Sequence, residues 1–147
     1  MLVELETGSG DMQLGGIRGD TRAQTGSGDA RISDPGGRVN IQTGSGDIEI
    51  RGARADVRVQ TGSGNVTVEG NPSAQSFWEL QTASGDVRLD VPADSSFTFV
   101  ARTRSSRVET EIPLEVTERS KNLVRGRVGK GDARIMVETS SGRVVLR

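Results

Sequence analysis

Carboxylates that recur at a fixed interval are the residues of this chain best placed to do chemistry. Thr-Gly-Ser-Gly-Asp occurs three times, ending at Asp11, Asp29 and Asp47, and each copy starts eighteen residues after the one before. A fourth copy keeps the interval and ends in Asn65. Rows of Asp beside Gly are typical of Ca²⁺-binding β-rolls, and eighteen residues equal about two of their nine-residue repeats.

The register of these residues argues against calcium. In the calcium repeat the ligand Asp lies about two positions after a Gly, and the apolar residue lies about two positions after the Asp. Here Asp47 directly follows a Gly, and Ile48 directly follows Asp47. The column also loses its carboxylate at Asn65 and becomes basic at Arg107 and Arg143. We therefore predict that the Asp column caps turns by bonding backbone amides, and that it binds no metal.

Two other motifs have a structural interpretation. Arg18-Gly19-Asp20 spells an integrin-recognition tripeptide, but it occurs once, and the corresponding turns at 36–38 and 53–55 have other sequences. The recurring Thr forms a single column at a corner, whereas an ice-binding face needs a flat and exposed array of two columns. We expect neither motif to bind a ligand.

Enzymes that act on polysaccharides are the remaining chemical alternative, because parallel β-helices include hydrolases and lyases. Such enzymes use clustered carboxylates or a carboxylate with a basic partner. The chain has no His, Cys or Tyr for acid–base work, nucleophilic attack or sugar stacking, and Trp78, Phe97 and Phe99 fall at inward positions. We predict that the protein is not an enzyme. The sequence identifies no catalytic, cofactor-binding or metal-binding residue, and the ligand-binding residues stay unknown.

The elements that hold these motifs are short strands. Between the third and fourth turns, residues 47–50 and 56–60 alternate apolar and polar side chains, which is typical of strands with one buried face. Gly-containing breaks separate the two runs, and the Gly residues of each turn allow the chain to reverse within a few residues. One repeat is therefore strand, turn, strand, turn, and self-similarity at this period predicts a solenoid.

Aligning the repeats by their turns places the apolar residues in inward columns. After the turn the inward pairs are Met12/Leu14, Ala30/Ile32, Ile48/Ile50, Val66/Val68, Val87/Leu89 and Val144/Leu146. Before the turn they are Val3/Leu5, Thr21/Ala23, Val39/Ile41, Val57/Val59, Trp78/Leu80, Phe99/Ala101 and Ile135/Val137. We predict an all-β, two-sheet parallel β-solenoid of about seven coils of 18–21 residues, stacked in chain order and right-handed.

The outward residues form columns of their own. Charges alternate in sign between neighbouring repeats, for example at Arg31 and Glu49, or at Arg58 and Glu79, as strand pairs prefer. A further column holds mainly amides: Glu6, Gln24, Gln42, Gln60, Gln81, Arg102 and Glu138. We interpret this column either as a ladder of hydrogen-bonded side chains or as a polar strip for a glycan or cell-wall polymer.

The later repeats are longer, and the last one contains an excursion at residues 113–130. Two repeats are twenty-one residues long and the next is thirty-six. We expect residues 113–127 to fold back as a cap that shields the outward apolar residues Val100 and Met136 and covers the strand edge there. The opposite edge, Val3–Thr7, has no comparable cover, so any association of the chain should use it.

Composition fits one small domain, residues 1–147. The 147 residues are 32% hydrophobic and carry a net charge of -1, which gives no electrostatic reason to bind nucleic acid or an anionic membrane. No Cys is present, and no apolar run approaches the about 20 residues that cross a bilayer. No signal peptide precedes the first repeat, and we expect the chain to begin inside a longer natural protein.

The turns and the C-terminal region together resemble the DUF4097 family of bacterial β-strand repeat proteins, whose members are often labelled adhesins. The resemblance rests on the Thr-Gly-Ser-Gly-Asp copies and on the stretches 112–115, 124–135 and 139–146. The chain is similar as well to autotransporter-adhesin head domains, whose repeats centre on the same Gly-Ser-Gly turns. The resemblance implies a β-solenoid facing the outside of a bacterial cell or its envelope, without catalytic or binding residues to transfer.

We therefore expect a non-enzymatic structural or adhesion-type module of a bacterial cell-envelope or extracellular protein, located outside the cytoplasm or at the cell surface. Two alternatives are a module that binds a carbohydrate or cell-wall polymer, and a rod that self-assembles through an open strand edge. The expected partners are a surface glycan, another envelope protein or a second copy bound through the N-terminal edge. We expect no cofactor, no nucleic acid and no membrane contact by this domain.

Overall fold

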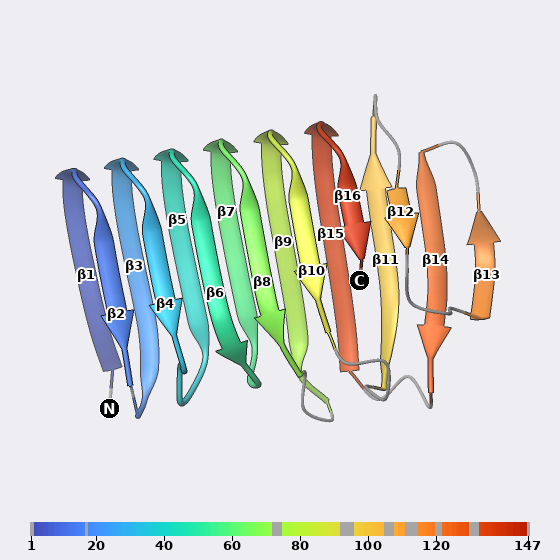
Figure 1. The fold of residues 1–147 in the computed structure, drawn as a ribbon, viewed down its shortest axis with the longest axis horizontal. Coiled ribbons are helices and arrows are strands. Elements are labelled where there is room, and N and C mark those ends of the chain that lie inside the picture. The colour runs from blue at the N-terminus through green and yellow to red at the C-terminus, as the bar shows by residue number, and fades with distance from the viewer. Residues whose placement is uncertain are drawn as a thin grey trace.

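The computed structural model describes residues 2–16, 18–71, 75–91, 96–104, 108–110, 115–119, 122–129 and 133–146. Within these ranges the chain forms strands and turns without a helix, so no helix of this part could cross a membrane. The strands lie in two sheets that face each other along the length of the molecule (Figure 1). The predicted all-β, two-sheet solenoid is therefore confirmed.

Nine strands form the first sheet and seven form the second. In spatial order the first sheet contains β1 (Leu2–Ser9), β3 (Asp20–Ser27), β5 (Val39–Ser45), β7 (Val57–Ser63), β9 (Phe77–Ser84), β15 (Ala133–Ser141), β11 (Phe97–Thr103), β14 (Leu123–Val128) and β13 (Glu115–Arg119). The second contains β2 (Met12–Gly15), β4 (Ala30–Ser33), β6 (Ile48–Ala53), β8 (Val66–Gly70), β10 (Val87–Asp90), β16 (Val144–Leu146) and β12 (Val108–Thr110). Neighbouring strands are parallel except at β14, which is antiparallel to β11 and to β13.

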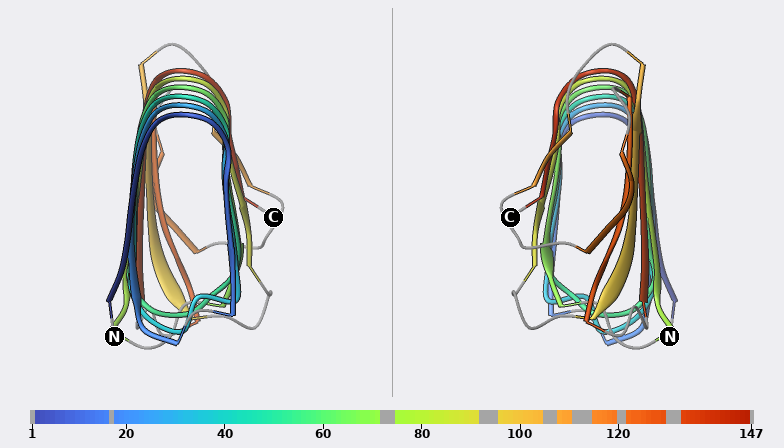
Figure 2. Two further views of the ribbon diagram at one scale, coloured as in Figure 1. Left: turned by 90° about the vertical axis from the view of Figure 1, so that its left-hand side faces the viewer. Right: turned by 90° about the vertical axis from the view of Figure 1, so that its right-hand side faces the viewer.

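Each coil contains one strand from each sheet. The Thr-Gly-Ser-Gly turn joins the two strands in the first four coils, and variants of it that start at Thr82 and Thr139 join β9 to β10 and β15 to β16. Viewed from the N-terminal end, the chain rises through β1, crosses the top of the molecule and descends through β2, and later coils lie farther from the viewer (Figure 2, left). This winding is right-handed, as predicted and as is usual for connections between parallel strands.

The repeat holds neighbouring strands in register. Thr43 of β5 pairs with Thr25 of β3 on one side and with Thr61 of β7 on the other. Because side chains alternate along a strand, this register places equivalent residues of successive repeats on the same face. Val57 and Val59 are accordingly buried between the sheets while Arg58 is exposed, so the predicted register is confirmed.

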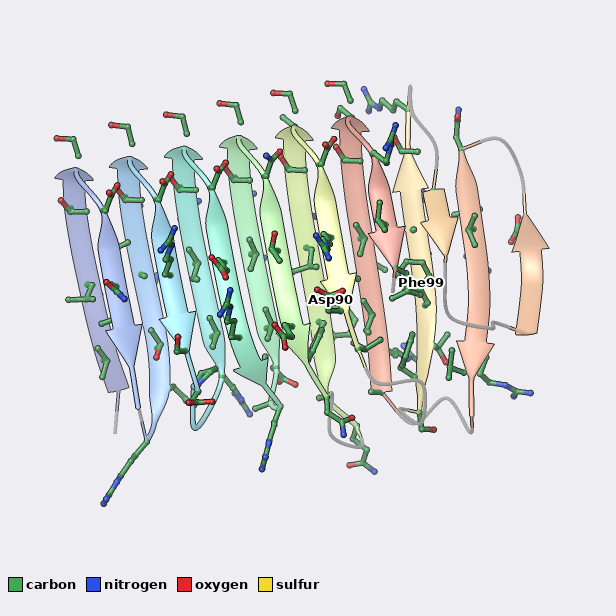
Figure 3. The ribbon with its side chains drawn as sticks, in the orientation of Figure 1. Asp90 and Phe99 are labelled. Carbon is green, nitrogen blue, oxygen red and sulfur yellow. The ribbon has the colours of Figure 1, made fainter. Side chains whose placement is uncertain are left out.

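Aromatic side chains fill the interior toward the C-terminal end. Trp78, Phe97 and Phe99 are fully buried, and Phe99 projects from β11 into the space between the sheets (Figure 3). The indole N–H of Trp78 donates a hydrogen bond to the carbonyl oxygen of Ala55 at 2.9 Å, which satisfies its one polar group. At the N-terminal end Met12 is only partly buried, because the first coil has a neighbour on one side only.

The last strand pair of the chain does not lie at the end of the stack. Five coils, from β1–β2 to β9–β10, follow one another in chain order, but β15 then lies between β9 and β11, and β16 lies between β10 and β12. The predicted count of about seven coils is therefore too high for the regular stack, which has about five turns in chain order, and the last strand pair is inserted out of that order. The physical reason is that β14 occupies the far edge of β11, so β15 pairs with the edge of β11 that faces β9.

The excursion forms a β-hairpin that extends the first sheet. β14 covers the edge of β11, with Val124 opposite Ala101 and Val128 opposite Phe97, and both valines are buried. The predicted cover of this strand edge is confirmed. The predicted shielding of Met136 is wrong, because the hairpin lies beside the sheet in its plane and leaves Met136 39% exposed. Val100, the other residue predicted to be shielded, is half-buried, and parts of the predicted cap, such as 113–114, lie outside the described residues.

Candidate functional site

The Asp of each turn is bonded to the backbone of the next coil. The amide of Asp29 donates to Asp11 Oδ1 at 3.0 Å, and the amide of Asp47 donates to Asp29 Oδ1 at 2.9 Å. Asn65 takes the same position, since its Oδ1 accepts a hydrogen bond from the amide of Asp86 at 3.0 Å. An amide oxygen accepts this bond as a carboxylate does, which explains why Asn can replace Asp in the column.

This geometry confirms the predicted capping role and corrects the identity of the partner. The capped amide belongs to the neighbouring coil rather than to the same turn. The bonding continues to Arg143, whose backbone amide donates to Asp86 Oδ1 at 2.9 Å. Across the described ranges no group of three or more His, Cys, Asp or Glu is arranged to hold a metal ion.

The Thr column lies inside the corner rather than on the surface. Thr43 Oγ1 donates to the carbonyl oxygen of Ser45 at 3.2 Å, and Thr61 Oγ1 donates to that of Ser63 at 3.3 Å. Both threonines are 4% exposed. These hydroxyls close the turns, and a buried column cannot provide the exposed array that ice binding requires. The corresponding turns form a regular row along the upper rim of the molecule (Figure 3).

The tripeptide Arg18-Gly19-Asp20 is also part of the stack. Asp20 is the first residue of β3, and its Oδ1 accepts a hydrogen bond from the amide of Arg38 at 2.9 Å. Asp56 accepts the corresponding bond from the amide of Phe77 at 2.9 Å. The carboxylate of the tripeptide therefore joins two coils at the second corner.

Outward charges pair between neighbouring coils. Arg31 Nε lies 3.6 Å from Glu49 Oε2 across β4 and β6, and Arg58 Nε lies 3.9 Å from Glu79 Oε2 across β7 and β9. The predicted alternation of sign is confirmed. Exposed ion pairs contribute about 0–1 kcal/mol each, so their main effect is to favour this register over a shifted one.

The column of neutral amides borders a groove on the outer face of the first sheet. The groove is open to solvent, has a volume of about 450 Å³ and crosses β5, β7, β9 and β15. Its lining includes Gln42, Gln60, Gln81 and Glu138 together with the small residues Gly62, Ala83 and Ser140. The amide ladder is formed in part: Gln42 Nε2 donates to Gln60 Oε1 at 3.4 Å, whereas Gln81 Nε2 donates to Glu79 Oε1 at 3.2 Å.

A second hollow lies on the second sheet, beside the ends of β6, β8 and β10. It encloses about 530 Å³, and its charged lining residues are Arg54, Glu69 and Asp90. Asp90, at the end of β10 (Figure 3), lies 3.6 Å from Arg88 Nε in an ion pair. Glu69 and Asp90 occupy equivalent positions of neighbouring coils, but the hollow combines charges of both signs and therefore does not indicate one class of ligand.

The sequence predicted the amide column but not the groove. Glu138 lies beside Gln81 only because β15 is inserted next to β9. Arg102, which follows Gln81 in the chain-order prediction, instead pairs with the far side of Glu138. The groove could have been predicted from the residue that follows each Thr, because the small residues Gly62 and Ala83 at this position leave space beside the amides.

These features define a class of protein: a right-handed parallel β-solenoid in which polar side chains join consecutive coils. The family model described as Toastrack DUF4097 matches residues 2–147, and the chain belongs to this family. The predicted DUF4097 membership is therefore confirmed. No curated protein and no solved structure matches the chain.

Proposed function

We propose that this domain is a non-enzymatic structural and adhesion-type module of a bacterial cell-envelope or extracellular protein. The observation that carries the proposal is the use of polar side chains to join the coils. Asp29 binds the amide of the next coil, Thr43 closes its turn, and Arg31 pairs with Glu49 of the neighbouring coil. Residues engaged in this way build a regular stack that presents a repeating polar surface.

A location outside the cytoplasm is part of this proposal. It is supported by the resemblance of the repeats to adhesin-type β-solenoids. The shape gives a second argument, because an extended and periodic surface suits contact with a large partner better than enclosure of a small substrate. The expected partner is a surface glycan or another envelope protein.

The experiment is antibody labelling of the domain in cells that carry the natural full-length protein. We expect equal labelling of intact and permeabilised cells, and weaker attachment of a gene-deletion strain to surfaces or to other cells. A cytoplasmic protein labelled only after permeabilisation serves as the control. Labelling of the domain only after permeabilisation would contradict the proposed location, and unchanged attachment would contradict the adhesive role.

The groove on the first sheet supports a second candidate function, the binding of a carbohydrate or cell-wall polymer. Its amides are exposed or partly exposed, repeat at the coil spacing and lie beside a column of small residues. A third candidate, self-assembly, is supported by β1 and β2, which are the end strands of their sheets. Glu4 and Glu6 on the outward side of β1 oppose the pairing of two such acidic edges, so we place self-assembly behind polymer binding.

A further inference from the structure

We propose that the groove along the amide column binds a linear, neutral polysaccharide, laid parallel to the solenoid axis with about one sugar per coil. The inference rests on the proposed adhesive role, because it assumes that the outer face of the first sheet is the surface that contacts the partner. It adds the chemical class of the ligand and the residues that hold it.

The spacing of the amides selects the ligand. Neighbouring strands lie about 4.8 Å apart, so Gln42, Gln60 and Gln81 present the same group at that interval. An extended chain of β-1,4-linked hexoses advances by nearly this distance for each sugar. Successive rings are turned over, and a Gln that is both donor and acceptor can bond to either edge of the ring. An extended peptide advances about 3.3 Å per residue, and a stacked nucleic acid strand advances about 3.4 Å per nucleotide. Neither polymer stays in step with the coils.

The chemistry of the lining suits hydroxyl and acetamido groups. Each Gln amide offers both a donor and an acceptor, and the one bond between Gln42 and Gln60 is long, at 3.4 Å. Gln24 continues the amide column by one coil, and Glu6 and Glu138 bound it at its two ends. These carboxylates accept hydrogen bonds from hydroxyls. Glu138 is the one charged side chain among the described residues that line the groove, and Arg102 lies beyond it on β11.

Small and apolar residues complete the site. Gly62 and Ala83 leave room for a sugar ring to approach the backbone of β7 and β9. Met136, which is 39% exposed, lies on the same outer face two residues before Glu138 on β15. The apolar C–H face of a sugar packs against side chains of this kind, while its hydroxyls bond to the amides.

The first measurement is calorimetric titration of the whole protein with two probes, hexamers of β-1,4-linked glucose and of β-1,4-linked N-acetylglucosamine. We expect at least one hexamer to bind with a micromolar to millimolar Kd. Affinity should rise from the dimer to the tetramer and then level off, because the groove crosses the four strands β5, β7, β9 and β15.

Two groove variants and one matched control locate the binding site. Gln60→Ala combined with Gln81→Ala removes two amides, and loss of two hydrogen bonds should raise Kd by about tenfold or more. Ala83→Arg fills the groove and should abolish binding. Gln13→Ala removes the same side chain from the outer face of the second sheet and should leave Kd unchanged. Circular dichroism and the melting temperature verify that each variant is folded.

The outcomes separate the groove from the wider proposal. Absence of binding by both hexamers, an unchanged Kd in the groove variants, or tighter binding of polygalacturonate or of a polyserine peptide overturns the inference. The purified protein could bind a hexamer while the domain is not labelled on intact cells. This result would support the assignment of the groove and contradict the proposed location outside the cytoplasm. Labelling of the domain on intact cells without binding of a hexamer would support the location outside the cytoplasm and overturn the assignment of the groove.

Discussion

At the scale of the residue, the two Gly of each turn have different requirements. Gly46 has a φ of 132°, and a Cβ added to it would lie 2.0 Å from the carbonyl oxygen of Gly28. A Cβ added to Gly44 would lie 2.7 Å from the carbonyl oxygen of Gly26, in an ordinary backbone conformation. Ala83 stands in the column of Gly44, so a small shift relieves that second contact.

This difference predicts unequal effects of the same substitution. Gly46→Ala should lower the free energy of unfolding by more than about 2 kcal/mol. The added methyl group would sit on a residue with positive φ and would clash with the backbone of the preceding coil. Gly44→Ala should cost less than about 1 kcal/mol. Urea unfolding measures both, and equal midpoints for the two variants would show that the φ of the second Gly is not the constraint.

The Asp column predicts metal independence. Each carboxylate whose bond is described, such as Asp29 and Asp47, already accepts a backbone amide of the next coil. Melting curves recorded with excess Ca²⁺ and with a chelator should therefore coincide. The variant Asp47→Asn should melt near the wild-type temperature because Asn65 makes the same bond. A rise of several degrees on adding Ca²⁺ would restore the β-roll interpretation.

The alternation of buried and exposed residues predicts a sharp contrast within β7. Val59→Asp places an unpaired carboxylate between the sheets and should cost several kcal/mol, on the order of 3 or more. Arg58→Ala removes a long, exposed ion pair with Glu79 and should change the stability by less than about 0.5 kcal/mol. Urea midpoints that differ little between the two variants would refute the register of the strand.

At the scale of the element, the β13–β14 hairpin protects the far edge of β11. Deleting residues 114–126 should lower the melting temperature and promote aggregation, because it exposes that edge and removes Val124 from the interior. Melting curves and light scattering measure the two effects. The control is Glu118→Ala with Arg125→Ala, which removes the exposed ion pair of 3.6 Å and leaves both strands of the hairpin in place. A monomeric deletion variant with unchanged melting would show that the hairpin is dispensable.

The order of the last elements could not be predicted from the sequence, although their faces could. Apolar and polar alternation fixed the inward side of β9, β11 and β15 because side chains repeat with period two. The Thr-containing turns of β9, β15 and β11 are alike, so Thr82 pairs as well with Thr139 as it would with Thr103. Proximity along the chain favoured β11 as the neighbour of β9, whereas the structure places β15 there. The groove, whose lining includes Glu138 of β15, was therefore not predicted.

At the scale of the whole molecule, the inserted strand pair β15–β16 is the feature on which both the stack and the groove depend. β15 and β16 join the five consecutive coils to β11, β12 and the hairpin. The same insertion brings Glu138 to the end of the amide column and Met136 to the outer face beside it. The stack and its proposed binding surface therefore share one determinant, the position of β15 beside β9.

Engineered disulfides test that position most directly, because the chain has no Cys of its own. Glu79 and Met136 are register partners on β9 and β15. Their Cα atoms should lie about 5 Å apart, within the range that a disulfide bridges. Glu79 and Val100 are separated by β15, at about 10 Å, which is too far. We predict that Glu79→Cys with Met136→Cys oxidises to a disulfide that does not lower the melting temperature, whereas Glu79→Cys with Val100→Cys keeps two free thiols. A disulfide in the second variant and free thiols in the first would contradict the account.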